Sequence, residues 1–166
     1  MKNKGIEIKL AYDEIDAIKE LFIEYREKLV NTYSHIEGVN FCFISFKEEL
    51  NSLSEIYKLP KGRLYIAKYN NEIAGCVALK PIDNKLCEVK RLYVKKEFRG
   101  LGIGKLLMDT VIKDAKELNY KTITLETFKS LEAAVHIYYK FGFRKIEKYD
   151  KALDANILYM ELDFEI

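Results

Sequence analysis

A glycine-rich turn between a strand-like segment and a helix-like segment places the strongest limit on how this chain can fold. It follows the alternating segment 86–94 and reads Arg99-Gly100-Leu101-Gly102-Ile103-Gly104-Lys105. Apolar residues then recur at helical spacing, at Leu107, Val111, Ala115 and Leu118. Glycines let the backbone approach a ligand closely, and the start of a helix adds the positive end of its dipole, so the turn favours a phosphate or pyrophosphate. Positive charge nearby comes from Lys95, Lys96, Arg99 and Lys105.

Two known nucleotide-binding patterns fit this turn poorly. A Walker A loop needs four residues between its glycines and a Ser or Thr after the Lys, whereas only three residues separate Gly100 from Gly104 and a leucine follows Lys105. The dinucleotide pattern G-x-G-x-x-G fails at its third glycine, although Glu126 imitates its ribose-binding acid. A dinucleotide-binding protein and a plain glycine-rich turn with solvated charges stay open as alternatives.

The pattern along the rest of the chain predicts a mixed, mainly antiparallel α/β sheet of six or seven strands flanked by about four helices. The expected strands are 5–10, 63–69, 72–79, 86–94, 122–126, 143–148 and 157–164. Helices are expected from Asp13 to about Leu29, over 46–57 behind a Ser45–Glu48 capping box, up to Leu118, and over 131–140. Asn70-Asn71 is typical of a two-residue hairpin, and Asn119 of a helix C-terminus.

Composition excludes several classes of protein. The 166 residues fit one domain, 1–166, and 28 Lys+Arg against 26 Asp+Glu leave a net charge of +2, too balanced for a general nucleic-acid binder. The three cysteines, at 42, 76 and 87, argue against a disulfide framework, and the two histidines lie too far apart to favour zinc. Neither a signal peptide nor a membrane span is evident, so we expect a cytoplasmic protein that needs no metal, nucleic acid or membrane.

Two motifs resemble those of the GNAT (GCN5-related) N-acetyltransferase superfamily, in its bacterial single-domain form. One is R-x-x-G-x-G at Arg99, Gly102 and Gly104. The other is A-x-x-I-Y-x-x-x-G-F from Ala134 to Phe143. The expected order of elements is also that of the superfamily. The resemblance implies acetyl-CoA as cosubstrate and transfer of its acetyl group to a primary amine, by direct attack in a ternary complex.

The resemblance also implies which residues would contact acetyl-CoA. The backbone of the strand end would pair with the pantetheine arm, the turn would hold the pyrophosphate, and an N–H near Leu92 or Tyr93 would face the thioester oxygen. Leu131 stands where the family often has an Asn, which removes one polar contact. The implied cofactor-binding residues are Leu92, Tyr93, Val94, Arg99, Gly100, Leu101, Gly102, Ile103, Gly104 and Lys105.

Two catalytic roles follow from the same resemblance. Tyr138 would protonate the departing thiolate, although its helical face also allows a plain core tyrosine. Glu88, on the strand before the turn, would be the general base, with Glu126 or a water-mediated route as alternatives. We expect His136 to be solvated and Cys87 to be a packed thiol.

The acceptor is not specified by the sequence. It would be a small-molecule or peptide amine, with Tyr33, Phe41, Phe43 and the loop Tyr149–Asn156 as candidate contacts. A non-catalytic acyl-CoA-binding module on the same fold is the other class of function left open, and a homodimer is equally open.

Overall fold

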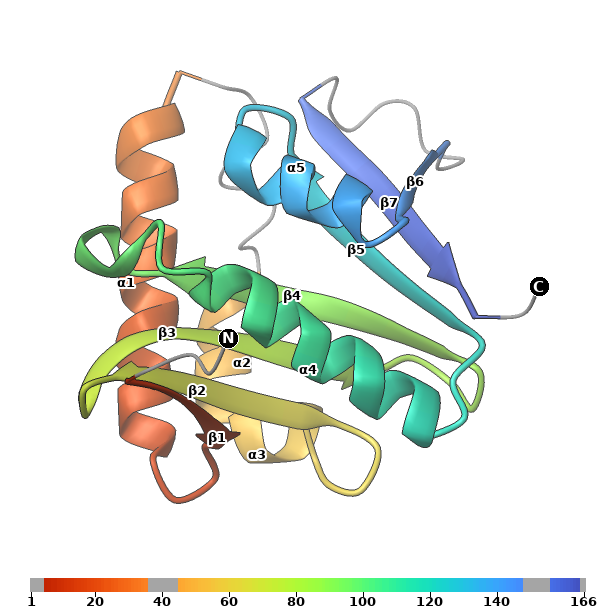
Figure 1. Ribbon diagram of the computed structural model, residues 1–166, viewed down its shortest axis with the longest axis horizontal. Coiled ribbons are helices and arrows are strands. Elements are labelled where there is room, and N and C mark those ends of the chain that lie inside the picture. Colours follow the sequence, from red (N-terminus) through yellow and green to blue (C-terminus); the bar gives the residue numbers. More distant parts are fainter. Residues whose placement is uncertain (1–4, 36–44, 148–155, 165–166) are drawn as a thin grey trace.

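One mixed sheet forms the centre of the protein (Figure 1). The computed structural model describes residues 5–35, 45–147 and 156–164, and within them seven strands pair in the order β1-β2-β3-β4-β5-β7-β6. The strands are β1 (Ile6–Leu10), β2 (Arg63–Tyr69), β3 (Glu72–Pro81), β4 (Leu86–Val94), β5 (Thr122–Phe128), β6 (Arg144–Ile146) and β7 (Ile157–Asp163). Every neighbouring pair is antiparallel except β4 and β5, which are parallel. The predicted fold class is confirmed.

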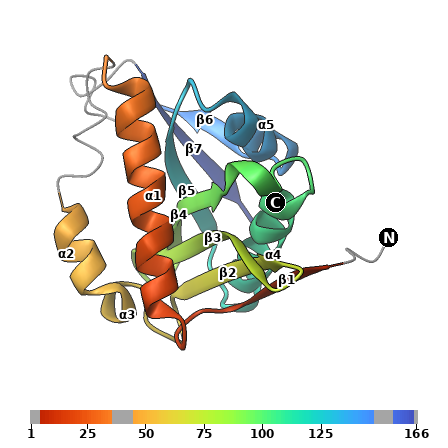
Figure 2. The same cartoon turned by 90° about the vertical axis from the view of Figure 1, so that its left-hand side faces the viewer.

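Helices cover both faces of this sheet (Figure 2). On one face lie α1 (Ile15–Tyr33), α2 (Phe46–Asn51) and α3 (Leu53–Ile56), and on the other lie α4 (Ile103–Glu117) and α5 (Glu132–Lys140). A short 3₁₀ turn, η2 (Lys96–Phe98), links β4 to the glycine-rich turn. The strand–helix–strand unit β4–α4–β5 therefore forms the parallel pair, as βαβ connections require.

The interior strand β3 is buried on both faces, because its side chains point alternately to the two sides of the sheet and helices cover both. Val77 and Leu79 pack with Leu107 and Met108 of α4, whereas Cys76 and its same-face neighbours pack with α1. On α1, the buried stripe predicted from the sequence includes Ile18, Phe22 and Leu29. This two-sided core makes β3 and β4 a rigid base for the residues at their ends.

Two asparagine turns have the backbone that the sequence predicts. Asn70 and Asn71 of the β2–β3 hairpin have φ of 49° and 70°, and Asn119 beyond the end of α4 has φ of 63°. Asparagine tolerates this left-handed region better than most residues. The hairpin and the helix end are therefore confirmed.

Several helix boundaries differ from the prediction. The expected single helix 46–57 is two short helices, because Ser52 between them has a non-helical backbone, with φ −132° and ψ 24°. The Ser45–Glu48 capping box is wrong, since Ser45 makes no side-chain cap hydrogen bond and its ψ of 24° is not extended. The first helix begins at Ile15 behind Glu14, not behind Asp13.

Candidate active site

β4 and β5 separate after the first three residues of each strand, and this separation creates the site. Their parallel register covers only the pairs Leu86–Thr122, Cys87–Ile123 and Glu88–Thr124. Beyond Glu88 the two strands run apart, with α5 following β5 (Figure 1). The far half of β4 therefore presents a backbone edge that β5 does not cover in the described register.

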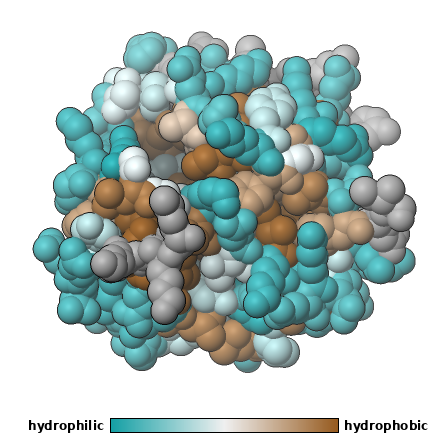
Figure 3. Space-filling view, viewed as in Figure 1, coloured by the Kyte–Doolittle hydropathy of each residue, from teal (hydrophilic) through white to brown (hydrophobic). Residues whose placement is uncertain are grey.

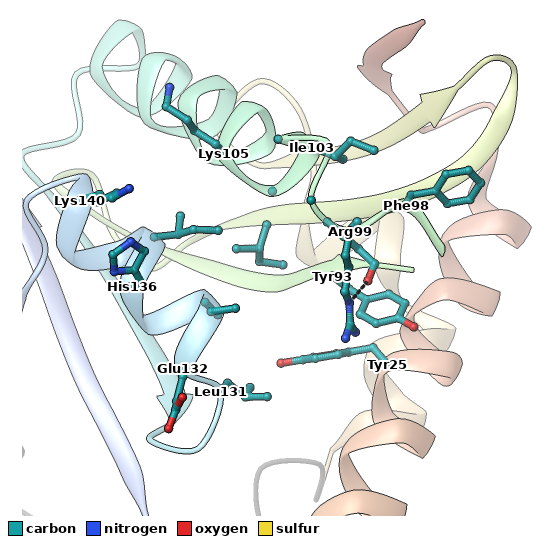
Figure 4. A pocket seen from close by; sticks show the side chains of 18 of the residues that line it. Tyr25, Tyr93, Phe98, Arg99, Ile103, Lys105, Leu131, Glu132, His136 and Lys140 are labelled. Carbon is teal, nitrogen blue, oxygen red and sulfur yellow. Dashed lines mark hydrogen bonds between the residues drawn. The ribbon is translucent and has the colours of Figure 1, made fainter. Parts of the chain in front are cut away.

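A cavity of about 710 Å³ lies at this edge. Its walls come from four segments: the end of β4, the glycine-rich turn, α5 with the residues before it, and α1 (Figure 4). The space-filling view shows a hollow with apolar walls in this region, rimmed by hydrophilic side chains (Figure 3). The implied cofactor-binding residues all line the cavity except Leu101, whose side chain is exposed; those on the wall are Leu92, Tyr93, Val94, Arg99, Gly100, Gly102, Ile103, Gly104 and Lys105.

The glycine-rich turn forms one end of the cavity. Gly100 and Gly102 have φ of 82° and 83°, a backbone conformation that residues other than glycine rarely adopt. Gly102 is also the N-cap of α4. A Cβ atom at either glycine would meet no protein atom within 4 Å, so the space in front of them is open. Arg99 closes the turn by donating a hydrogen bond from Nε to the Val94 carbonyl at 3.1 Å (Figure 4). The unpaired N–H groups of the α4 N-terminus thus border open space, which suits an anion such as a pyrophosphate.

A β-bulge in β4 adjoins the other end of the cavity. Cys76 of β3 pairs with Tyr93 and Ala78 pairs with Lys90, so the single residue between them on β3 opposes two on β4, Arg91 and Leu92. Arg91 has a φ of 58°. A bulge bends its strand and interrupts the ladder, so it changes the direction of the backbone just where Leu92 and Tyr93 reach the cavity.

Comparison with known proteins assigns this arrangement to a family. The model of the acetyltransferase (GNAT) family matches residues 16–143, which is most of the chain. The chain belongs to the GNAT family of acetyltransferases. The family resemblance seen in the two sequence motifs is therefore confirmed.

Individual GNAT relatives support the same assignment. An uncharacterised N-acetyltransferase of Schizosaccharomyces pombe is 34% identical over 158 residues, covering 94% of this chain and 91% of the relative. The crystal structure of a GNAT acetyltransferase from Staphylococcus aureus has a TM-score of 0.72 and 29% identity, covering 95% of this chain and 99% of that one. A GNAT acetyltransferase from Elizabethkingia anophelis, solved with acetyl-CoA bound, has a TM-score of 0.54 and 31% identity, covering 67% and 81%.

Tyr138, the residue that the GNAT motif implies as general acid, lies in the core beside the cavity. Its side chain is 5% exposed, and its ring packs against Phe143 with 5.9 Å between centroids. Ile137 and His136 of the same helix line the cavity, whereas Tyr138 is not among the lining residues. Burial raises the pKa of Tyr138 well above its ordinary value of 10.0, so the phenol stays protonated.

Both candidate bases border a small cleft of about 40 Å³ where β4 and β5 separate. Glu88 lies there with its Oε1 atom 3.2 Å from Nζ of Lys90, and both side chains are about one-fifth exposed. Glu126 of β5 lines the same cleft. The structure thus brings the two alternative bases together, on opposite sides of the gap between the strands.

Tyr25 of α1 is a site residue that the sequence did not reveal. It lines both the large cavity and the small cleft, and its ring lies 5.4 Å from that of Tyr93. Its helical spacing matches the buried stripe of α1, so the pattern indicated only a core residue. In Figure 4 the ring of Tyr25 reaches from α1 across the cavity toward Leu131.

Tyr93 is tied to α1 by a polar network. Its hydroxyl donates to Glu24 Oε1 at 2.7 Å and accepts from Lys28 Nζ at 2.7 Å. Burial and the Glu24 carboxylate outweigh the Lys28 charge and raise the pKa of Tyr93.

Of the candidate acceptor contacts, Tyr33 lines the cavity, whereas Phe41, Phe43 and residues 149–155 lie outside the described residues.

The remaining expectations concern histidine, cysteine and metals. His136 is exposed, as expected, but it also lines the cavity. Cys87 is fully buried, and burial raises the pKa of its thiol to about 12, so it is the packed thiol that was expected.

In the described residues, no cluster of three or more His, Cys, Asp or Glu side chains could hold a metal ion. None of the described helices combines the length and apolar character that a membrane span requires.

Proposed function

We propose that this GNAT-family protein binds acetyl-CoA in the 710 Å³ cavity and transfers the acetyl group to a primary amine by direct attack in a ternary complex. One observation carries the proposal: the cavity runs from the glycine-rich turn at the start of α4 to the uncovered edge of β4, and Glu88 and Glu126 line the small cleft where β4 and β5 separate. A phosphate group, an extended pantetheine arm and an amine each have a matching part of the site.

The turn and the strand edge would hold the cofactor. Backbone N–H groups of the turn and the charges of Arg99 and Lys105 would bind the pyrophosphate. The edge of β4 would pair with the amides of the pantetheine arm as a further strand does. An N–H of Leu92 or Tyr93, next to the bulge, would bind the thioester oxygen and stabilise the charge that develops there.

The acceptor amine must lose a proton before it attacks. An ordinary lysine-type amine has a pKa near 10.4, so deprotonation at pH 7 costs about 4–5 kcal/mol. Glu88 would accept this proton directly or through water, and Glu126 across the gap is the alternative. Tyr138 would donate a proton to the leaving thiolate of CoA, and its hydroxyl must reach the cavity through the wall of α5.

The residues around the large cavity and the small cleft favour an acceptor that binds as a cation. Aromatic rings of Tyr25, Tyr33 and Tyr93 line the cavity, and ammonium groups are attracted to such rings. The carboxylates of Glu88 and Glu126 add negative charge near the point of attack. We therefore expect a small molecule or peptide that carries a primary amine.

A test of the function needs two measurements. Calorimetry should show that acetyl-CoA binds, and a thiol assay over a panel of polyamines, amino acids, aminoglycosides and peptides should show CoA release that depends on an amine. Binding without amine-dependent release from any acceptor would favour a non-catalytic acyl-CoA-binding module. Thermal stabilisation by NAD but not by acetyl-CoA would favour a dinucleotide-binding protein.

A further inference from the structure

A buried carboxylate on α2 is bound to the residue that forms the β4 bulge. Glu49 accepts hydrogen bonds from Arg91 Nε at 3.2 Å and from Arg91 Nη2 at 2.5 Å, and a third from the Tyr57 hydroxyl at 2.5 Å. The Glu49 and Arg91 side chains are each about one-tenth exposed. The guanidinium of Arg91 also lies 5.6 Å from the ring centroid of Phe46. The Arg91 side chain is therefore held at its far end by charge, geometry and packing.

Arg91 needs such an anchor because its backbone is unfavourable. Its φ of 58° lies in the left-handed region, where Cβ crowds the following carbonyl oxygen and where glycine is the usual choice. Here the position carries a long side chain instead. A planar guanidinium bound by both oxygens of a carboxylate has little freedom to turn, so its attachment also restricts the backbone from which it extends.

The bulge lies directly before the residues that reach the cavity. Arg91 is followed by Leu92, Tyr93 and Val94, which all line it. We infer that Glu49 is a positioning residue for acetyl transfer: by binding Arg91 it keeps the bulge in place and thereby directs the backbone N–H of Leu92 or Tyr93 toward the thioester. This inference rests on the proposed function, which assigns one of these two N–H groups to the thioester oxygen.

A chemically matched cluster lies on α4 and β2, and the strand β3 separates it from the bulge in β4. Asp114 of α4 accepts a hydrogen bond from Arg63 Nε at 2.6 Å and another from the Tyr65 hydroxyl at 2.6 Å. The Asp114 and Arg63 side chains are 14% and 16% exposed. Arg63 is not among the described residues with positive φ, and none of the three lines the cavity. Loss of this carboxylate should therefore cost stability alone.

The first test compares Glu49→Gln with Asp114→Asn at a temperature well below both melting points. Both substitutions should lower the melting temperature. Only Glu49→Gln should lower kcat, by about 10-fold or more, because an active-site group displaced by about 1 Å can cost roughly 10²-fold. An unchanged kcat in Glu49→Gln, or an equal loss in both variants, would overturn the inference.

A second test asks whether the bulge itself is what Glu49 maintains. In Glu49→Gln combined with Arg91→Gly, glycine adopts the positive φ without an anchor. We expect this double variant to recover most of the lost kcat while its melting temperature stays low. A double variant that is as slow as Glu49→Gln would count against the bulge as the link.

Amide hydrogen exchange gives a readout that does not depend on activity. Residues 91–94 should exchange faster in Glu49→Gln than in the parent, and at the parental rate in Asp114→Asn. Unchanged exchange in Glu49→Gln would overturn the inference. If the exchange responds as expected but the parent releases no CoA with any amine, the proposed function fails while the attachment of the bulge to Glu49 stands.

Discussion

Tyr138 packs its ring against Phe143, with 5.9 Å between the ring centroids, on the core side of the helix whose neighbouring residues line the cavity. This placement fits both roles considered for Tyr138, the packing residue and the general acid. A phenol behind the cavity wall can be a packing residue, or it can be a proton donor that is shielded until the thioester is bound. The two roles differ in what the hydroxyl contributes, and the hydroxyl can be removed alone.

We expect Tyr138→Phe to lower kcat roughly 10²–10⁴-fold, because general acid catalysis is worth that much. The melting temperature should change little, since the substitution removes almost no volume. Turnover and thermal unfolding measured on the same preparation check this. Near-parental turnover would exclude the acid role of Tyr138, and Tyr25→Phe would then test the phenol that lines the cavity itself.

For Glu88 we expect a change in the pH dependence of the rate. If Glu88 takes the proton from the amine, Glu88→Gln should lower kcat and remove the acidic limb of the pH–rate profile, with acetyl-CoA affinity little changed. Glu126→Gln, across the same cleft, is the matched comparison. A normal profile in Glu88→Gln together with an altered one in Glu126→Gln would transfer the role to Glu126.

At Gly102 we expect a loss of cofactor binding. Valine there would place a side chain in the open space before the α4 N-terminus and would strain a backbone with φ of 83°. Acetyl-CoA affinity measured by calorimetry should fall at least about tenfold, which corresponds to about 1.4 kcal/mol. Gly102→Asn separates the two effects, because asparagine tolerates positive φ but still fills the space. Parental affinity in both variants would place the pyrophosphate elsewhere.

The Glu49–Arg91 pair should also set the stability of the protein in acid. Burial alone would raise the pKa of Glu49, but the hydrogen bonds and charge of Arg91 outweigh it and hold the pKa below its ordinary value of 4.5. The unfolded carboxyl therefore binds protons at a higher pH than the folded one. Its contribution to stability is complete above about pH 4.5 and is lost as the pH falls through the lower, folded pKa.

Glu49→Gln should reveal this contribution in unfolding experiments at several pH values. At neutral pH the substitution removes the carboxylate that pairs with the buried guanidinium of Arg91, and it should cost about 3–5 kcal/mol of unfolding free energy. Below about pH 4.5 the difference between parent and variant should narrow, because the parental carboxyl becomes neutral too. A difference that stays constant into acid would contradict a lowered pKa of Glu49 in the folded protein.

The sequence alone was enough for features that depend on neighbouring residues. The glycine-rich turn, the Asn70-Asn71 hairpin and the apolar stripe of α1 each follow from local backbone preference or from the spacing of side chains along one element. Nearly all of the implied cofactor-binding residues line one cavity. They form two continuous segments, 92–94 and 99–105, which are close in the sequence and therefore close in space. The resemblance to the GNAT family likewise depends on short motifs, Arg99 to Gly104 and Ala134 to Phe143.

Tertiary structure decided what depends on contacts between distant segments. Glu49 and Arg91 are 42 positions apart, and the predicted helix that carries Glu49 breaks at Ser52. The bulge at Arg91 has no local signature, because an arginine with positive φ persists only when partners elsewhere hold it. The sequence pattern does not distinguish Tyr25 from the core residues of α1. Tyr25 lines the cavity only because β4 and β5 separate beside it. Hydrophobic spacing tells which face of an element is buried, but the strand register and the packing of helices on the sheet determine which of those buried residues face a cavity.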